Sequence, residues 1–248
     1  MRKINFLRIG IYALVSVVLL QSCKDDSNLA APPPVPDQSF VEEFDTVSAA
    51  LSRGWKLINV SVPKGSGIWQ QGGDITPWFQ AFSSNGSNAG FIGADYLSTS
   101  AAAGIISNWL VSPVVTYKNG DKISFYTRTL IYNAAPPGAP VDSTDYANRL
   151  QLLISQNDGL NVGNGDESGD FSALIDINPN YIEYHSNPAL YSPFAYPARW
   201  TRFETTISGL NAPKTGRLAF RYFVEGAGSN GLGSGVAIDK VEFKSASK

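Results

Sequence analysis

The side chains that could do chemistry in this chain are mostly carboxylates, with few other reactive groups beside them. His185 is the only histidine and Cys23 the only cysteine among the 248 residues. A zinc site needs several nitrogen or sulfur ligands, so none is expected. A Ser-His-Asp triad is formally possible, but no G-x-S-x-G nucleophile elbow occurs. His185 is therefore predicted to be a surface residue.

Paired carboxylates could support glycoside hydrolysis if two of them lay about 5 or 9 Å apart across a cleft. The sequence offers candidates by type only and brings no two of them together. These candidates are Glu42, Glu43, Asp45, Glu183, Glu204, Glu225 and Asp239. A glycan-active hydrolase is kept as an alternative function, and no catalytic residue is predicted.

Two further patterns imitate ligand-binding loops. Gly226–Gly231 fits G-x-G-x-x-G, but the dinucleotide motif must open a helix, and here another strand is expected to follow. Asn164-x-Asp166-x-Ser168-Gly169 matches the first half of an EF-hand loop, but Ile175 stands where the bidentate Glu belongs. The first is predicted to be a flexible loop between strands and the second a polar turn.

The N-terminus indicates export followed by lipid attachment. Three basic residues precede the apolar run Ile11–Leu20, which is shorter than the ~20 residues of a spanning helix. Leu20-Gln21-Ser22-Cys23 resembles the lipobox of bacterial lipoproteins, whose cysteine becomes the acylated first residue. We therefore expect residues 1–22 to be removed and Cys23 to anchor the chain in the outer membrane.

The segment after Cys23 is predicted to be a tether. Lys24-Asp25-Asp26 resembles the surface-export signal of Bacteroidetes lipoproteins, which implies display on the cell surface. The proline-rich remainder of residues 23–38 favours an extended spacer, so residues 39–248 form the folded domain. Removal of the signal peptide would shift the formal net charge from −2 to −5. With no cluster of Lys and Arg, nucleic acid is not an expected partner.

The folded domain is expected to be all-β. Short runs rich in β-branched and aromatic residues alternate with Gly, Pro, Asn and Ser, and no long segment has helical periodicity. In several runs apolar residues recur at every second position, and some runs are apolar on both faces. The predicted fold is an antiparallel two-sheet jelly-roll sandwich. The expected strands are 40–44, 55–60, 67–71, 90–94, 109–116, 122–132, 149–156, 200–207, 217–224 and 236–243.

A binding role is predicted from aromatic residues in loop-like segments. Residues 158–197 are expected to be one long loop rich in Asn, Gly, Tyr and Pro, and long ordered loops often carry function. Exposed aromatic rings can stack on sugars or anchor a protein partner. The candidate ligand contacts are Trp69, Trp78, Tyr181, Tyr184, Tyr191 and Tyr196.

Four segments resemble the choice-of-anchor J and cleaved-adhesin group of bacterial surface domains, which is similar to MAM-like jelly rolls. They are 40–45 followed by 54–55, then 108–115, then 121–128, and last 218–222 closing with 235–241, which includes Ala237-Ile238-Asp239-Lys240-Val241. Lys240 departs from a second acid that members often have, and residues 158–197 have no counterpart. The resemblance implies a non-enzymatic adhesion or binding module for carbohydrate or protein. A structural component of an outer-membrane assembly is a further alternative.

The same resemblance implies a structural calcium ion where the first strand meets the last. It places Glu43 and Asp45 on the first strand and Asp239 on the last. Calcium binds six to eight oxygens, which carboxylates and carbonyls supply. The competing interpretation is that Asp239 caps a turn or pairs with a lysine.

Overall fold

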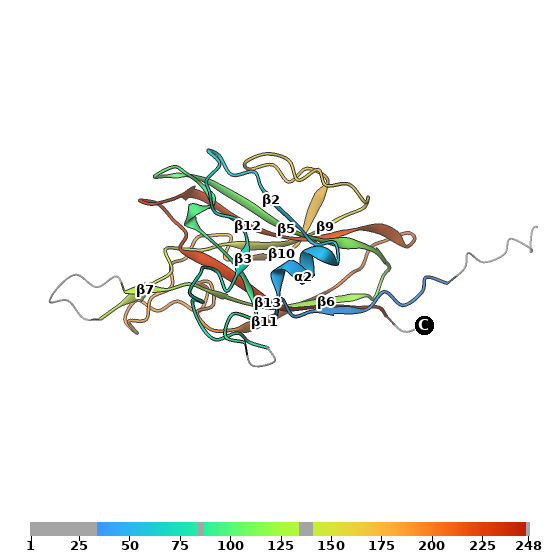
Figure 1. Cartoon of the computed structure of the whole chain (residues 1–248), viewed down its shortest axis with the longest axis horizontal. Coiled ribbons are helices and arrows are strands. Elements are labelled where there is room, and N and C mark those ends of the chain that lie inside the picture. The colour runs from blue at the N-terminus through green and yellow to red at the C-terminus, as the bar shows by residue number, and fades with distance from the viewer. Residues whose placement is uncertain (1–33, 84–86, 134–140, 247–248) are drawn as a thin grey trace, which may run out of the picture. The chain divides into compact units, whose positions relative to one another are not determined.

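A computed structural model describes residues 34–83, 87–133 and 141–246. From Val35 on, the chain forms one unit built from two antiparallel sheets, which lie above one another in Figure 1. The predicted all-β sandwich of jelly-roll type is confirmed. The five-stranded sheet has the order β10 (Phe171–Ile177), β9 (Leu150–Ser155), β12 (Lys214–Ala227), β5 (Gly104–Tyr117) and β2 (Lys56–Asn59).

The second sheet is six-stranded and contains both the first and the last strand of the domain, which pair with each other. Its order is β11 (Thr201–Thr206), β6 (Lys122–Thr129), β13 (Gly235–Lys244), β4 (Ile92–Asp95) and β3 (Gln70–Gln71), with β1 (Phe40–Glu42) paired to β13. Phe40 pairs with Phe243, and their rings stack with centroids 5.9 Å apart. The first and last strands of the domain therefore hold one another, as a sandwich closed by its termini requires.

The main core fills the space between the sheets and follows the alternation seen in the sequence. Ile123, Phe125 and Thr127 of β6 are fully buried, whereas Tyr126 between them is only partly so. Phe125 meets Phe220 of the facing sheet edge to face, with ring centroids 4.8 Å apart. Aromatic pairs of this kind add about 0.5–1.5 kcal/mol each to the burial of their area.

Apolar residues on the outer faces are covered by loops. On the five-stranded sheet Trp109, Leu153 and Ala219 form a second cluster with Val162 and Phe171, contributed by the 156–170 loop and the start of β10. On the six-stranded sheet a third cluster contains Phe91 and Ala237, covered by residues of the 73–82 loop and by Trp200. Some strands are apolar on both faces because the facing sheet covers their inner face and loops cover their outer face.

The prediction of one long loop at 158–197 is wrong. β10 interrupts it, and its residues pair with β9 from Phe171↔Ser155 to Ile177↔Leu150. β10 is an edge strand of the five-stranded sheet, so the loops before and after it begin at opposite ends of this strand. Short elements that the sequence did not predict separately are α2 (Val47–Ser52), the 3-10 turn η1 (Tyr96–Ser98) and the hairpin β7 (Tyr132–Asn133) with β8 (Ser143–Thr144).

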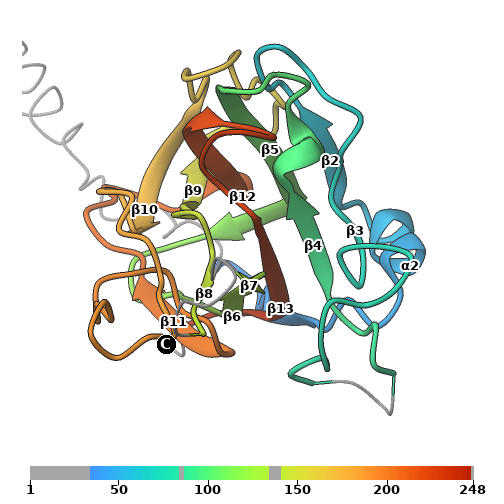
Figure 2. The same ribbon diagram turned by 90° about the vertical axis from the view of Figure 1, so that its left-hand side faces the viewer.

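One end of the sandwich collects most of the irregular structure. The loop after β10, the β7–β8 hairpin, η1 and the turn between β12 and β13 all meet there (Figure 2). β13 starts just after the β12–β13 turn and therefore ends at the other end of the sandwich. β1 begins there too, because Phe40 pairs with Phe243. The tether that precedes β1 therefore joins the domain at the end opposite the irregular loops.

Candidate functional site

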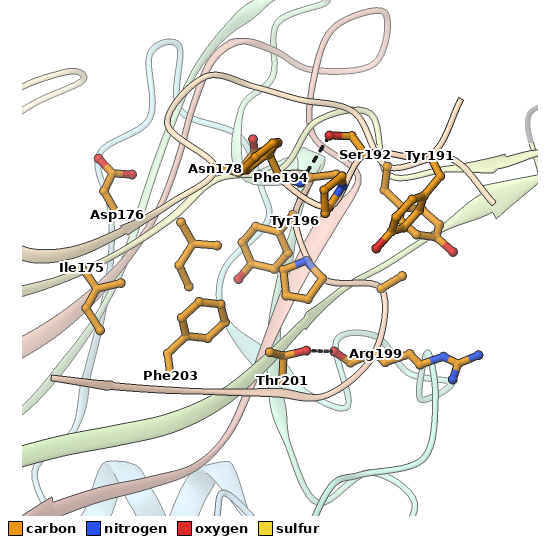
Figure 3. Close-up of a pocket in the computed structure, with 16 residues that line it drawn as sticks. Ile175, Asp176, Asn178, Tyr191, Ser192, Phe194, Tyr196, Arg199, Thr201 and Phe203 are labelled. Atoms are coloured by element: carbon orange, nitrogen blue, oxygen red, sulfur yellow. Dashed lines mark hydrogen bonds between the residues drawn. The ribbon is translucent and has the colours of Figure 1, made fainter. Parts of the chain in front are cut away.

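A groove of about 690 Å³ lies between the 178–200 loop and the ends of β10 and β11 (Figure 3). Its walls combine aromatic, aliphatic and polar groups, a composition typical of ligand sites. Tyr184, Tyr191 and Tyr196, three of the six predicted ligand contacts, line it. The second half of the predicted loop therefore does form a concave surface.

The rim of the groove carries large apolar side chains in contact with solvent. Phe194 is 74% exposed and Tyr191 is 59% exposed, and the neighbouring Leu190 is 54% exposed. The loop between them is held locally, since Phe194 N–H donates to Ser192 Oγ over 3.3 Å (Figure 3). Exposed apolar groups gathered on one loop are a common mark of a contact surface.

The floor of the groove is rigid. Tyr196 is fully buried, and its hydroxyl lies 2.6 Å from Thr127 Oγ1 of β6. The Thr127 hydroxyl itself donates to the Ala237 carbonyl, so the phenol must donate to Thr127. Burial raises the pKa of Tyr196 well above its usual value. Tyr196 therefore supports the groove and is not an exposed ligand contact, which corrects the prediction for this residue.

Among the described residues a single carboxylate, that of Asp176, lines the groove, and its oxygens accept hydrogen bonds from within the fold. Arg149 donates to both of its oxygens, over 2.9 and 2.6 Å, and Gln151 donates to Oδ2 over 2.8 Å. The hydrogen bonds that Arg149 donates to Asp176 in turn raise the pKa of Arg149 further above its usual value. The groove thus lacks the free carboxylate pair that glycoside hydrolysis requires.

The prediction of an exposed ring is also wrong for Trp69. Its side chain is fully buried in the main core, where it packs among residues of both sheets. Loop-like flanks had suggested the surface, but the residue just before β3 points inward. Trp69 is a structural residue.

Trp78 and Tyr181 are partly exposed but lie outside the groove. Trp78 covers the outer face of the six-stranded sheet, where its ring presses on Gly73: a Cβ built there would come within 2.3 Å of the ring. The Tyr181 hydroxyl accepts from Arg149 over 3.1 Å and lies 3.2 Å from Glu225 Oε2. Both rings are committed to packing or to hydrogen bonds within the fold.

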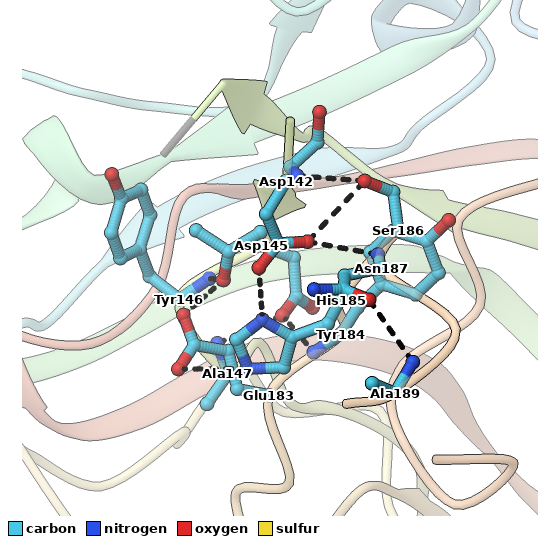
Figure 4. Close-up of polar contacts among 12 residues, drawn as sticks. Asp142, Asp145, Tyr146, Ala147, Glu183, Tyr184, His185, Ser186, Asn187 and Ala189 are labelled. Carbon is cyan, nitrogen blue, oxygen red and sulfur yellow. Dashed lines mark hydrogen bonds and ion pairs between the residues drawn. The ribbon is translucent and has the colours of Figure 1, made fainter. Parts of the chain in front are cut away.

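His185 is partly buried and joins two loops. Its Nδ1 lies 2.7 Å from Asp142 Oδ2 and its Nε2 lies 3.6 Å from Glu183 Oε2 (Figure 4). Asp142 also accepts from the N–H of Asn187 over 3.0 Å, and its pKa is lowered, chiefly by the His185 hydrogen bond. The predicted surface histidine is thus partly exposed, and it has a carboxylate on each side.

The three residues proposed as calcium ligands lie around the junction of β1 and β13. β1 ends at Glu42, so Glu43 and Asp45 follow the first strand and are not part of it. Asp239 is fully buried beside a bulge in β13, and its Oδ2 accepts from Phe82 and Ser83 N–H over 2.9 and 3.1 Å. Asp239 thus caps a turn, as the competing interpretation predicted.

Each of these acids nevertheless keeps one buried oxygen without a hydrogen-bond partner in the described residues: Glu43 Oε2, Asp45 Oδ1 and Asp239 Oδ1. Burial, with the Glu43 charge adding to it, raises the pKa of Asp239 to about 7. Oxygens of this kind suit calcium in their chemistry. In the part of the chain that the structure describes, however, no three His, Cys, Asp or Glu side chains form a group that could hold a metal ion.

The predictions for the N-terminus fall outside the described residues. The structure does not describe Cys23, the signal peptide 1–22 or most of the tether. Among the residues that are described, none of the helices has the length and apolar character needed to cross a bilayer. Lipid attachment and surface display therefore stay predictions from the sequence.

Comparison with known proteins finds similarity of fold alone. No family model and no curated protein matches the chain. The K3 cleaved adhesin domain of Lys-gingipain from Porphyromonas gingivalis is 16% identical over 85% of this chain and 100% of that domain, with a TM-score of 0.47. The K2 cleaved adhesin domain of Lys-gingipain is 16% identical over 84% and 99%, with a TM-score of 0.49.

A carbohydrate-binding module is also among the similar structures. TmCBM61, solved with beta-1,4-galactotriose, is 12% identical over 83% of this chain and 99% of that module, with a TM-score of 0.39. The choice-of-anchor J assignment has no family match. The fold class itself rests on the strand pairing of this chain.

Proposed function

We propose that this chain is a non-enzymatic binding module, anchored to the outer membrane through Cys23 and displayed on the cell surface, which captures a protein or carbohydrate ligand in the groove after β10. The observation that carries the proposal is the groove itself: exposed aromatic side chains line a concave surface whose floor is fixed by hydrogen bonds. Its position opposite β1 agrees with a tether that holds the groove away from the membrane.

A protein ligand is favoured at this groove. Leu190, Tyr191 and Phe194 present apolar surface that a partner could cover, and Arg199 beside them is exposed and charged. Aromatic residues and Arg are the types that most often dominate binding energy at protein interfaces. The rival hydrolase is disfavoured because Asp176 is held by Arg149 and Gln151.

The test is a screen of the full-length chain against arrayed host proteins and glycans, repeated with Tyr191→Ala and Phe194→Ala. Both side chains are exposed, so folding is expected to be unchanged, while ligand affinity falls roughly tenfold or more. Leu160→Ala, an exposed apolar residue in the loop at the other end of the sandwich, is the matched control. A ligand whose affinity ignores both aromatic substitutions would reject the groove, and release of sugar from any glycan would favour the hydrolase.

A further inference from the structure

A second cavity, of about 440 Å³, lies at the same end of the sandwich but is separate from the groove in its lining. Tyr96 of η1, Tyr132 of β7 and Tyr146 after β8 form its aromatic side, and residues 228–234 of the β12–β13 turn form the rest. Figure 2 shows these segments at the end of the sandwich that faces the viewer. The geometry points to a binding site for a neutral sugar ring.

The aromatic side is open to a ligand. Tyr132 and Tyr146 are 41% and 38% exposed, and their rings are tilted by 44° with centroids 6.3 Å apart. They therefore do not cover each other face to face, and each leaves ring surface in the cavity. The hydroxyls of all three tyrosines donate to no other group in the described part of the chain. A sugar ring could stack its apolar face on the tyrosine rings and hydrogen bond through its hydroxyls to the tyrosine hydroxyls.

The backbone that presents Tyr146 is strained and firmly held. Tyr146 and Ala147 have φ of 54° and 61°, a left-handed conformation that ordinary residues rarely adopt. Tyr146 N–H donates to Thr144 Oγ1 over 3.1 Å, and Ala147 N–H donates to the buried Asp145 over 2.9 Å. Figure 4 shows the Tyr146 ring pointing away from this polar network. Strain of this kind persists where the surroundings fix it, and it is typical of ligand sites.

The opposite wall is polar and uncharged. Ser229 and Asn230 are exposed at the turn, and their side chains make no hydrogen bond within the described residues. The turn keeps its shape because Asn230 N–H donates to the Ala102 carbonyl over 3.0 Å. Gly228 packs directly against the backbone of Ala101: a Cβ at position 228 would lie 2.1 Å from the Ala101 carbonyl oxygen, so no larger residue fits there. Two polar side chains on a fixed turn thus line the cavity together with the three tyrosines.

The charge around the cavity decides between classes of sugar. Among the described residues, no Lys, Arg, Asp or Glu lines it. A carboxylated or sulfated sugar would therefore find no cation there to pair with. A quaternary ammonium group could also sit against three tyrosines. Ser229 and Asn230 favour a hydroxylated ligand instead, because an ammonium group of that kind cannot hydrogen bond to them.

The experiment is a titration of the full-length chain, followed by saturation-transfer NMR, with glucose, galactose, mannose and N-acetylglucosamine. Glucuronic acid and choline are tested alongside them. We expect at least one neutral sugar to bind. Tyr132→Ala or Tyr146→Ala should lower the affinity for that sugar by roughly tenfold. Tyr146→Phe keeps the ring and should have a smaller effect. Circular dichroism checks that each variant is folded, and Leu160→Ala is the control.

The outcomes separate this site from the groove. A neutral sugar whose binding is weakened by Tyr132→Ala and by Tyr146→Ala in folded protein supports the proposal, whatever ligand the groove binds. Binding of choline or glucuronic acid with the same dependence would overturn it, because the ligand class would be wrong. Absence of binding by all four neutral sugars, or a response only to Tyr191→Ala and Phe194→Ala, would also overturn it.

Discussion

The main-chain N–H of Tyr184 donates to the carboxylate of Asp145 over 2.9 Å, although 39 positions separate the two residues. The same carboxylate oxygen accepts from Ala147, so one buried acid fixes both the groove residue Tyr184 and the strained turn that carries Tyr146 (Figure 4). The groove and the tyrosine cavity are therefore supported by a common residue.

Replacing Asp145 with Asn should loosen both sites at once. Asn has one acceptor oxygen and would place donor hydrogens near the N–H groups that Asp145 now accepts. A buried group left without its partner costs about 1–3 kcal/mol, so we expect a lower melting temperature. Asp158→Asn, at an exposed position, is the control and should leave the melting temperature unchanged. Equal melting curves for the two variants would show that Asp145 does not hold these loops.

The strands were predictable because their signal is local. Alternation at every second position identifies the buried faces of β6, β9 and β12, and each expected strand overlaps an observed one. β10 was missed although Phe171, Leu174, Ile175 and Ile177 are apolar, because its sequence Phe171–Ile177 lacks regular alternation and lies between segments rich in Asn and Gly. A bulge between Ala173 and Ile175 explains the broken alternation.

The sites were less predictable because they depend on pairing between distant segments. Tyr96, Tyr132 and Tyr146 meet only after β4 and β6 have paired on either side of β13. The left-handed conformation of Tyr146 has no local signal, since no glycine or asparagine stands there. Trp69 shows the reverse error: its flanks are typical of a loop, but the core determines its direction.

Arg221 should be a key residue for the 158–170 loop. It is almost fully buried on the outer face of the five-stranded sheet, and it donates to the Gly165 carbonyl over 2.6 Å and to Ser107 Oγ over 3.0 Å. Burial lowers the pKa of its guanidinium to about 10. Arg221→Met should keep much of the packing on Phe223 but leave Gly165 without its donor.

We expect Arg221→Met to cost about 1–3 kcal/mol in the free energy of unfolding and to make the 158–170 loop sensitive to protease. Urea denaturation measures the first effect and limited proteolysis the second. Lys214→Met, at the start of the same strand, is the control, because the Lys214 side chain makes no hydrogen bond in the described residues and a smaller loss is expected. If the two variants lose the same free energy of unfolding, the buried hydrogen bonds of Arg221 do not stabilise the domain.

Membrane attachment is predicted to depend on Cys23 alone. Cys23→Ser removes the thiol that would be acylated, so the chain should move from the membrane fraction to the soluble fraction while the domain stays folded. Fractionation and circular dichroism measure the two effects. Continued membrane association of the serine variant would contradict the lipid anchor.

Surface display is predicted to depend on Lys24-Asp25-Asp26. Replacing all three with Ala should leave a lipoprotein that protease added to intact cells no longer digests. The unchanged chain is the comparison, and Asn28→Ala in the same tether is the matched control. Equal digestion of all three proteins would mean that these residues do not direct export.

Asp239 makes the stability of the domain depend on pH. Its folded pKa of about 7 lies above its usual value of 3.8, so the protonated form favours the folded state. This contribution is complete below about pH 4 and is lost as the pH rises through about 7. Without added calcium, the melting temperature should fall over that interval, and Asp239→Asn should remove this part of the fall. Asp158→Asn should keep the full pH dependence.

The family resemblance predicts calcium on the free oxygens of Glu43, Asp45 and Asp239, although in the described residues these side chains do not form a group that could hold a metal ion. A bound calcium ion would reverse the loss. Protons and calcium compete for the same carboxylates, so calcium should raise the melting temperature more at pH 8 than at pH 5, and a chelator should cancel the rise. Asp239→Asn should abolish the difference, because it removes a charged ligand from the buried centre. A pH dependence that remains the same with and without calcium would mean that Asp239 is neutralised by a proton and caps the Phe82 turn, with no metal ion at this junction.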